Sequence, residues 1–170
     1  MTIDTTVIDL FAGPGGLGEG FSAFAPSDGQ HPFHIEMSVE KEASAHKTLQ
    51  LRAFYRQFKG EVPDEYYAFL KGEIQREELF EAFPAQHEAA VAETLGGPMA
   101  LGNDDDDVII YKRLKALTKQ DGPRVVIGGP PCQAYSLVGR ARNKGKKDYR
   151  AEDDHRHFLY EEYLRVLWSV

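Results

Sequence analysis

Short apolar runs alternate with stretches of helical spacing along this chain. Thr6–Phe11, Phe33–Val39 and Val125–Ile127 are apolar runs that end at glycine, proline or a charged residue, so each predicts a buried strand. The stretches between them repeat their apolar residues at helical spacing, and helices are expected over Glu19–Phe24, Lys41–Phe58 and Val108–Lys119. Strands that alternate with helices indicate an α/β fold with a mostly parallel sheet.

Three further segments complete this picture. Pro63–Leu95 sets apolar residues among many acids and predicts a group of short helices, and Asp154–Val170 predicts a final helix. The run Asp104–Asp107 is interpreted as a solvated turn and helix start. A metal site is disfavoured there, because four consecutive residues cannot all converge on one ion.

The amino-acid composition is typical of one soluble domain. The 170 residues are 42% hydrophobic and 28% charged, with no apolar stretch near 18 residues and no basic leader, so we expect a cytoplasmic protein. The net charge of −7 argues against a nucleic-acid partner, but the charge is uneven. Residues 61–107 hold thirteen acids and two bases, whereas Gly139–Arg150 hold six bases and one acid. The basic segment predicts a loop that contacts phosphates.

A glycine-rich turn follows the first predicted strand. Gly13-Pro14-Gly15-Gly16-Leu17-Gly18 has the spacing G-x-G-x-x-G, and Glu40 ends the next predicted strand. Glycines let the backbone approach a ligand, and an acid at that position can bind a ribose diol. The spacing also fits a dinucleotide site or a tight turn without a ligand. A phosphate-binding P-loop is disfavoured, because no Lys-Ser or Lys-Thr follows the glycines.

The single cysteine, Cys132, lies just beyond the third predicted strand, after Gly128-Gly129-Pro130-Pro131. It cannot form an internal disulfide, and a thiol that only fills space would be expected inside the apolar run. Ligands and catalytic groups of open α/β sheets gather at the carboxyl ends of the strands. Cys132 is therefore predicted to be a nucleophile.

Together, two long motifs resemble a known family. Asp9-Leu10-Phe11-Ala12-Gly13-Pro14-Gly15-Gly16-Leu17 and Gly129-Pro130-Pro131-Cys132-Gln133-Ala134-Tyr135-Ser136 are similar to the first and fourth motifs of the DNA cytosine-5 methyltransferases. The resemblance implies a Rossmann-like, S-adenosylmethionine-dependent methyltransferase fold over residues 1–170, truncated, with a helical insertion at about 55–97. It also implies methyl transfer to C5 of a cytosine flipped out of double-stranded DNA, through a covalent Cys132 adduct at C6.

The resemblance assigns roles to individual residues. The S-adenosylmethionine site would include Phe11, Ala12, Gly13, Gly15, Gly16, Leu17, Glu40, Pro130 and Leu159, the last in a segment similar to the fifth motif. Asp104 is the nearest match for the acid that contacts adenine, with Leu101-Gly102-Asn103 as the alternative. Contacts to nucleic acid are expected from Gln133, Ser136, Arg140, Arg142 and Lys144. No metal ligand is expected.

Other motifs of the family have no match in these 170 residues. They are the Glu-Asn-Val motif whose glutamate protonates the ring at N3, the arginine-rich eighth motif, the target-recognition region and a late motif of the cofactor pocket. The chain is therefore interpreted as the amino-terminal part of a bacterial or phage-type enzyme, inactive alone, with a complementing carboxyl-terminal half as one partner. An NAD- or FAD-dependent oxidoreductase, a non-catalytic half that serves as a binding module, and an RNA substrate remain as alternatives.

Overall fold

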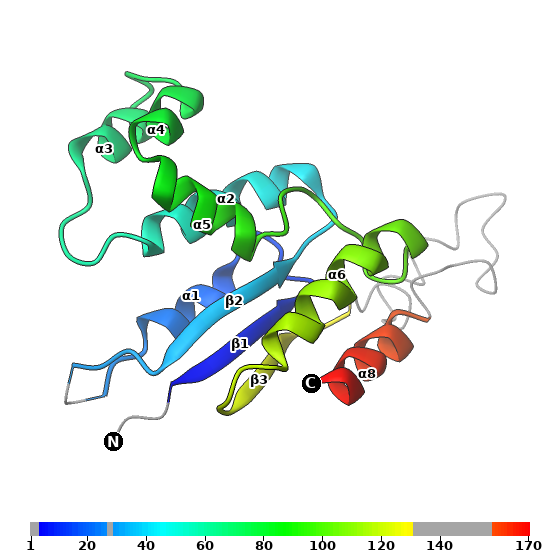
Figure 1. Ribbon diagram of the computed structural model, residues 1–170. Helices are drawn as coiled ribbons and strands as arrows, with labels where there is room; N and C mark the ends of the chain where they lie inside the picture. The colour runs from blue at the N-terminus through cyan, green and yellow to red at the C-terminus, as the bar shows by residue number, and fades with distance from the viewer. Residues whose placement is uncertain (1–3, 27–28, 131–157) are drawn as a thin grey trace, which may run out of the picture.

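A parallel sheet forms the centre of the molecule. The computed structural model describes residues 4–26, 29–130 and 158–170. In these ranges β1 (Thr5–Leu10) lies between β2 (Phe33–Val39) and β3 (Arg124–Gly128), and both pairings are parallel (Figure 1). The α/β fold class predicted from the sequence is confirmed. Each strand lies within one residue of its predicted bounds at either end, because buried parallel strands are continuous apolar runs.

Two helices follow the first two strands. α1 (Gly16–Ala23) begins three residues before the predicted start, because Gly15 adopts a φ of 86° and turns the chain into the helix directly. α2 (Ala43–Arg56) begins after Glu42, whose side chain accepts a hydrogen bond from the Ala45 N–H and caps the helix.

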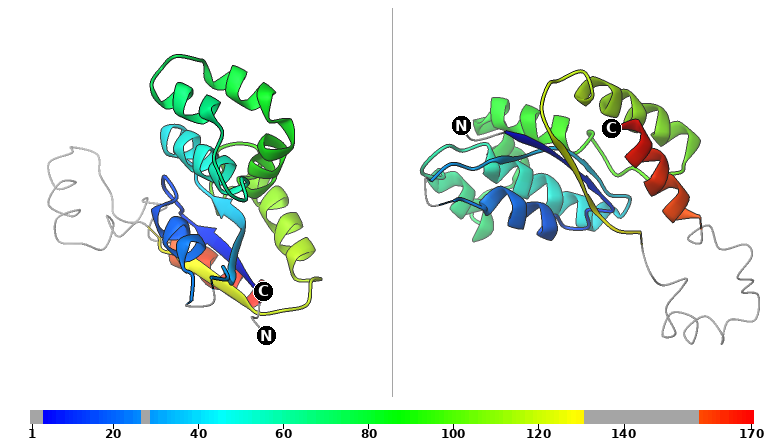
Figure 2. Two further views of the ribbon diagram at one scale, coloured as in Figure 1. Left: turned by 90° about the vertical axis from the view of Figure 1, so that its left-hand side faces the viewer. Right: turned by 90° about the horizontal axis from the view of Figure 1, so that it is seen from below.

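One face of the sheet is covered by α6 (Asp104–Leu117) and α8 (Leu159–Ser169), which lie side by side in Figures 1 and 2. Their buried side chains meet those of the strands in one core, which comprises Ile8, Leu10, Met37, Val39, Met99, Leu101, Ile110, Leu114, Leu117 and Val166. α6 starts at Asp104, four residues before its predicted start, because the Asn103 side chain accepts from the N–H groups of Asp105 and Asp106. The interpretation of the aspartate run as a helix start is confirmed.

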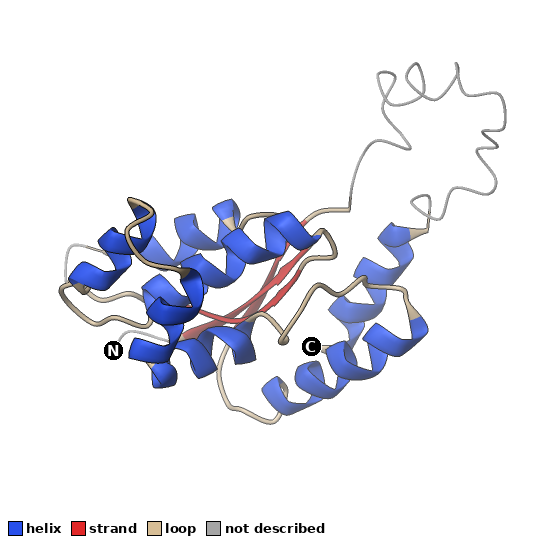
Figure 3. Ribbon diagram, turned by 90° about the horizontal axis from the view of Figure 1, so that it is seen from above, coloured by secondary structure: helices blue, strands red, loops and turns tan. Residues whose placement is uncertain are grey.

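Three short helices pack around a second core at one end of the molecule (Figure 3). They are α3 (Asp64–Leu70), α4 (Arg76–Ala82) and α5 (Pro84–Glu93), and they surround Phe54 of α2. The ring of Phe54 lies 5.0 Å from that of Phe80 and 5.2 Å from that of Phe58. The predicted group of short helices is confirmed. None of the helices in the described ranges is long and apolar enough to cross a membrane.

The end of β3 tolerates glycine alone. Gly128 has a φ of 97°, and a Cβ atom there would lie 1.8 Å from the carbonyl oxygen of Leu10 on the neighbouring strand. A side chain would have to push β1 and β3 apart at the point where both strands end. The close approach of the two strand ends therefore depends on the missing side chain.

We expect Gly128→Ala to lower the free energy of unfolding by about 3 kcal/mol or more, since it combines a left-handed backbone with a backbone clash. Gly129→Ala is the matched control, because a Cβ at Gly129 would meet no described residue within 4 Å apart from its neighbours in the chain. Urea denaturation followed by circular dichroism measures both variants. Equal midpoints for the two variants would contradict this account of the strand ends.

Candidate functional site

The turn after β1 is tied to the end of β2. The Ala12 N–H donates to the Val39 carbonyl at 3.0 Å, and the Gly13 N–H donates to Oε2 of Glu40 at 2.8 Å. Oε1 of Glu40 accepts from the Glu42 N–H at 2.6 Å. These bonds fix the Glu40 carboxylate beside the glycine-rich turn, although each oxygen keeps a lone pair for a ligand.

Phe11 adopts a strained backbone at this turn. Its φ is 56°, in the left-handed region that residues with a side chain rarely occupy. Such a conformation costs about 1–3 kcal/mol and persists where the surrounding structure enforces it, commonly at ligand sites. The half-buried Phe11 side chain borders the cavity described below.

The segment between α5 and α6 closes the other side of the site. The Met99 N–H donates to the Glu40 carbonyl at 2.8 Å, so this segment is attached directly to the end of β2. Asp106 and Asp107 then accept from the N–H groups of Ala100 and Gly102 at 2.8 and 3.0 Å. Two of the four consecutive aspartates therefore fold this loop against its own helix.

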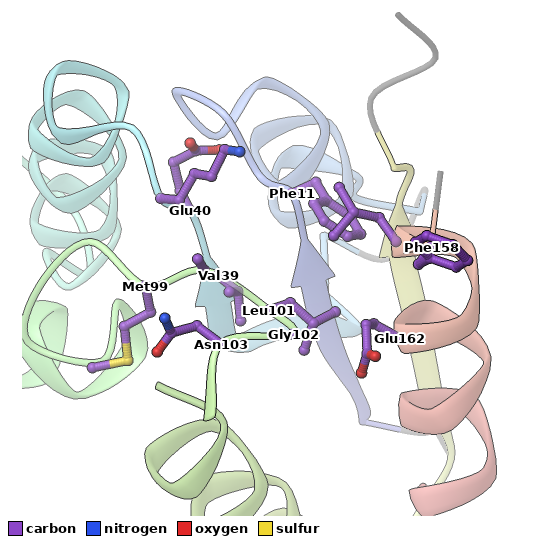
Figure 4. Close-up of a pocket in the computed structure, with 12 residues that line it drawn as sticks. Phe11, Val39, Glu40, Met99, Leu101, Gly102, Asn103, Phe158 and Glu162 are labelled. Carbon is purple, nitrogen blue, oxygen red and sulfur yellow. The ribbon is translucent and has the colours of Figure 1, made fainter. Parts of the chain in front are cut away.

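A cavity of about 280 Å³ opens between these segments and α8, at the carboxyl edge of the sheet (Figure 4). Its walls are largely apolar, with polar groups at a few positions. The lining residues come from the ends of β1 and β2, the loop before α6, and the start of α8: Phe11, Val39, Glu40, Lys41, Met99, Ala100, Leu101, Gly102, Asn103, Phe158, Leu159 and Glu162.

The cavity brings together three of the predicted cofactor residues. Phe11, Glu40 and Leu159 line it, although they lie far apart in the sequence. Ala12 and Gly13 form the turn beside it. The other predicted cofactor residues in the described ranges do not line it: Gly15, Gly16, Leu17, Asp104 and Pro130.

These five residues occupy different places. Gly15 packs under α2, where an added Cβ would lie 2.8 Å from Cδ1 of Leu49. Gly16 borders a separate open hollow with Arg52, whereas Leu17 and Asp104 are exposed. Pro130 follows β3, half-buried. The alternative to Asp104, the Leu101-Gly102-Asn103 loop, does line the cavity.

The predicted nucleophile and nucleic-acid contacts lie outside the described residues. They are Cys132, Gln133, Ser136, Arg140, Arg142 and Lys144. β3 ends at Gly128, at the same edge of the sheet as the cavity. The roles assigned to Cys132 and to the other five residues therefore stay predictions.

Sequence reasoning missed several cavity residues, among them Met99, Phe158 and Glu162. Glu162 lies three residues after Leu159, one helical turn along α8, so helical spacing from a predicted contact could have found it. No sequence pattern points to Met99, because its position at the cavity depends on the hydrogen bond between its N–H and the Glu40 carbonyl.

Asp9 is a buried carboxyl group next to the turn. It is 1% exposed, and neither of its oxygens has a donor in hydrogen-bond geometry among the described residues. Burial raises the pKa of Asp9 to about 6, and the Gly18 amide and the Arg56 guanidinium counteract only part of this rise. Gly18 and Gly128 both approach this side chain, since a Cβ at either position would lie 3.2 Å from a carboxylate oxygen.

A second buried acid connects the short helices to α1. Glu93 of α5 accepts hydrogen bonds from Arg56 at 2.6 Å and from the Ser38 hydroxyl at 3.4 Å, and Arg56 also pairs with Glu19 of α1. Burial raises the pKa of Glu93 to about 7 despite the opposing charge of Arg56. This network fixes the helix that starts in the glycine-rich turn against α2 and α5.

Comparison with known proteins identifies relatives of one kind. The chain is 33% identical over 178 aligned positions, 95% of its length, to a type II methyltransferase of Bacillus paralicheniformis, of which the match covers 37%. It is 31% identical over 93% of its length to a protein of Oceanobacillus iheyensis provisionally named a type II methyltransferase, with 25% of that protein covered. The chain therefore matches only 37% and 25% of the length of these two relatives. No family model and no solved structure matches.

The α/β architecture with a parallel sheet is that of a Rossmann-like methyltransferase fold. The similarity to type II methyltransferases extends over nearly the whole chain, so it includes the turn, Glu40 and the loop before α6.

The raised pKa of Asp9 predicts a pH-dependent stability. A carboxyl group that binds its proton more tightly when folded contributes stability below its unfolded pKa of 3.8, and this contribution is lost as the pH rises through about 6. The free energy of unfolding of the wild type, relative to Asp9→Asn, should fall by about 2 kcal/mol between pH 4 and pH 7. Urea denaturation of both proteins at each pH measures this difference. Other titrating groups contribute equally to the wild type and the variant, so their contributions cancel in the difference. A difference that stays constant with pH would rule out the shift.

Proposed function

We propose that this chain is the cofactor- and nucleophile-bearing part of a DNA cytosine-5 methyltransferase that uses S-adenosylmethionine. The observation that carries the proposal is the cavity at the carboxyl edge of the sheet. It brings together Phe11, Glu40 and Leu159, three positions that the family resemblance assigns to the cofactor. The relatives named as type II methyltransferases support the same class of activity.

The cavity suits the adenosyl part of this cofactor. Its volume lies near the lower limit of small-molecule sites, about 300 Å³, which is of the order needed for a nucleoside. The Glu40 carboxylate can accept both ribose hydroxyls, because the Gly13 and Glu42 amides use only one lone pair of each oxygen. Apolar side chains such as Val39 and Leu101 can pack against the flat face of a purine ring.

The chemistry assigned to Cys132 follows from the electronic structure of cytosine. C5 is a poor nucleophile, and addition of the Cys132 thiolate to C6 moves electron density onto C5. S-adenosylmethionine supplies an electrophilic methyl group when it is bound. Loss of the C5 proton and elimination of the thiolate from C6 then restore the aromatic ring and the free enzyme.

The substrate base must leave the DNA stack before this thiol can reach it. Flipping costs a few kcal/mol, and contacts to the phosphates offset that cost. Arg140, Arg142 and Lys144 belong to the basic segment proposed for this role, together with Gln133 and Ser136. The acid that protonates N3 has no match in the 170 residues, so we assign it to a complementing polypeptide segment.

A nicotinamide or flavin cofactor is the competing assignment, since G-x-G-x-x-G followed by an acid also fits it. The relatives named as methyltransferases favour S-adenosylmethionine. Preferential binding of NAD or FAD would overturn the proposal.

Glu40→Gln should weaken the binding of S-adenosylmethionine about tenfold or more, because a charge-assisted hydrogen bond to the ribose diol is lost. Isothermal titration calorimetry measures the change, with NAD as the comparison ligand. Glu42→Gln is the matched control, since Glu42 caps α2 and does not line the cavity. Equal losses in the two variants would remove Glu40 from the cofactor site.

The purified chain alone should transfer no methyl group to DNA. Co-expressed with the carboxyl-terminal remainder of the Bacillus relative, it should form a covalent adduct with DNA that contains 5-fluorocytosine, because fluorine cannot leave C5 as a proton does. Denaturing electrophoresis detects the adduct, and Cys132→Ser should abolish it. An adduct that persists in Cys132→Ser would exclude this thiol as the nucleophile.

A further inference from the structure

The strand β3 forms an open edge of the sheet. Among the described residues it pairs with β1 alone, so no strand lies along its outer edge. The Thr6 N–H donates to the Pro123 carbonyl at 3.0 Å, and residues of a parallel strand point alternately to one neighbour and to the other. Val125 and Ile127 therefore direct their backbone groups at β1, whereas Val126 directs its N–H and carbonyl outward.

The helix α8 lies on the β3 side of α6. Nη2 of Arg113 on α6 donates to the Glu36 carbonyl of β2 at 2.8 Å, whereas the Tyr163 hydroxyl of α8 donates to the Val126 carbonyl of β3 at 3.4 Å. Because the sheet order is β2-β1-β3, a step from α6 to α8 leads toward the open edge. The side of α8 that is turned away from α6 therefore lies next to the outer edge of β3.

That side of α8 is apolar and exposed. Leu164, Leu167 and Trp168 recur at i, i+3 and i+4, so they share one side of the helix. All three are exposed, Trp168 to 85%. Val166 makes the core contact of α8 and Glu162 packs on the loop before α6, which leaves the three apolar residues on the remaining side. An exposed apolar strip beside an open strand edge marks an interaction surface.

The connections of the sheet indicate what pairs with β3. The chain passes from β2 to β3 through α6, across β1. Crossovers between parallel strands are right-handed in about 98% of cases. Since α8 covers the same face as α6, a strand that follows α8 with this hand lies beside β3, on the side away from β1. The expected occupant is therefore a parallel strand. A second copy of the chain is disfavoured, because a twofold axis would make its β3 antiparallel.

The relatives contain sequence that could provide this strand, since the chain matches only 37% and 25% of their lengths. We propose that the outer edge of β3 and the apolar strip of Leu164, Leu167 and Trp168 form one docking surface. It takes a parallel strand with apolar side chains from the complementing methyltransferase segment. The inference rests on the proposed function, which requires such a segment, and it adds the place where that segment binds.

Amide hydrogen exchange tests the strand pairing. In the chain alone, the Val126 N–H should exchange at least about tenfold faster than the Val125 N–H, because only the latter donates to β1. In the complex with the carboxyl-terminal remainder of the Bacillus relative, the ratio of the two rates should approach one. NMR measures both rates, and their ratio is insensitive to a general gain in stability. A ratio that the complex leaves unchanged would overturn the inference.

Charge on the apolar strip tests the contact of α8. The double variant Leu164→Glu, Leu167→Glu should bind the carboxyl-terminal remainder about tenfold or more weakly, because docking would bury both carboxylates. Leu70→Glu is the matched control, since Leu70 is a leucine at the end of α3 that is 57% exposed and lies in the group of short helices. It should keep the wild-type affinity in calorimetry. Equal affinities of the two variants would exclude the strip from the interface.

Trp168 reports on the same surface directly. It is the single tryptophan of the chain, so incorporation of 5-fluorotryptophan labels this position alone. Its fluorine NMR signal should shift when the carboxyl-terminal remainder is added. The chain alone should sediment as a monomer. A dimer that the double variant abolishes would mean that a second copy occupies the surface, and would contradict the proposed occupant.

The two proposals fail in different ways. If the complex forms through this surface but gives no adduct with DNA that contains 5-fluorocytosine, the proposed function fails and the docking surface stands. If the adduct forms while the double variant binds as tightly as the wild type, the function stands and the docking surface is wrong. If no complex forms, the docking surface is wrong, and the binding of S-adenosylmethionine by the chain alone still decides on the cofactor.

Discussion

The site depends on the carboxyl group of Glu40. Its Oε2 fixes the Gly13 amide, its Oε1 fixes the Glu42 amide, and its backbone carbonyl accepts from Met99. One residue therefore joins the turn after β1, the start of α2 and the loop before α6. These segments lie at the carboxyl edge of the parallel sheet, where side chains from separate strands converge. Glu40 thereby fixes two sides of the cavity, the turn after β1 and the loop before α6, and the start of α8 lines the cavity as well.

Much of the fold could be predicted from hydrophobic pattern, since every strand lies within one residue of its expected bounds. Helix starts were predicted less well, because they depend on single contacts. Gly15 begins α1 by its positive φ, and Asn103 begins α6 by capping. Neither effect changes the apolar periodicity from which the helices were predicted. The acidic run that forms the first turn of α6 was correctly interpreted as a helix start.

The candidate site was predicted where a motif coincides with a strand end. Phe11 and Glu40 each follow a strand, and both line the cavity. Asp104 was chosen by its position in the sequence, yet its neighbours Asp106 and Asp107 are the ones with structural roles, and they bind loop amides. Glu162 was missed because its proximity to Gly102 arises from packing between α8 and a loop some sixty positions earlier. Such contacts have no local sequence signal.

Buried acids concentrate around the same turn, and their cost explains why so much structure surrounds it. Asp9 lies between α1 and the end of β3 without a hydrogen-bond partner in the part of the chain that the structure describes, and Glu93 reaches α1 through Arg56. Burial raises the pKa of both groups, so each destabilises the fold when it is ionised near neutral pH. A fold selected for stability alone would replace them with apolar residues of similar size. Asp9 lies two positions before the strained Phe11, and this combination is typical of a region organised for a ligand, because strain and uncompensated polarity gather at functional sites.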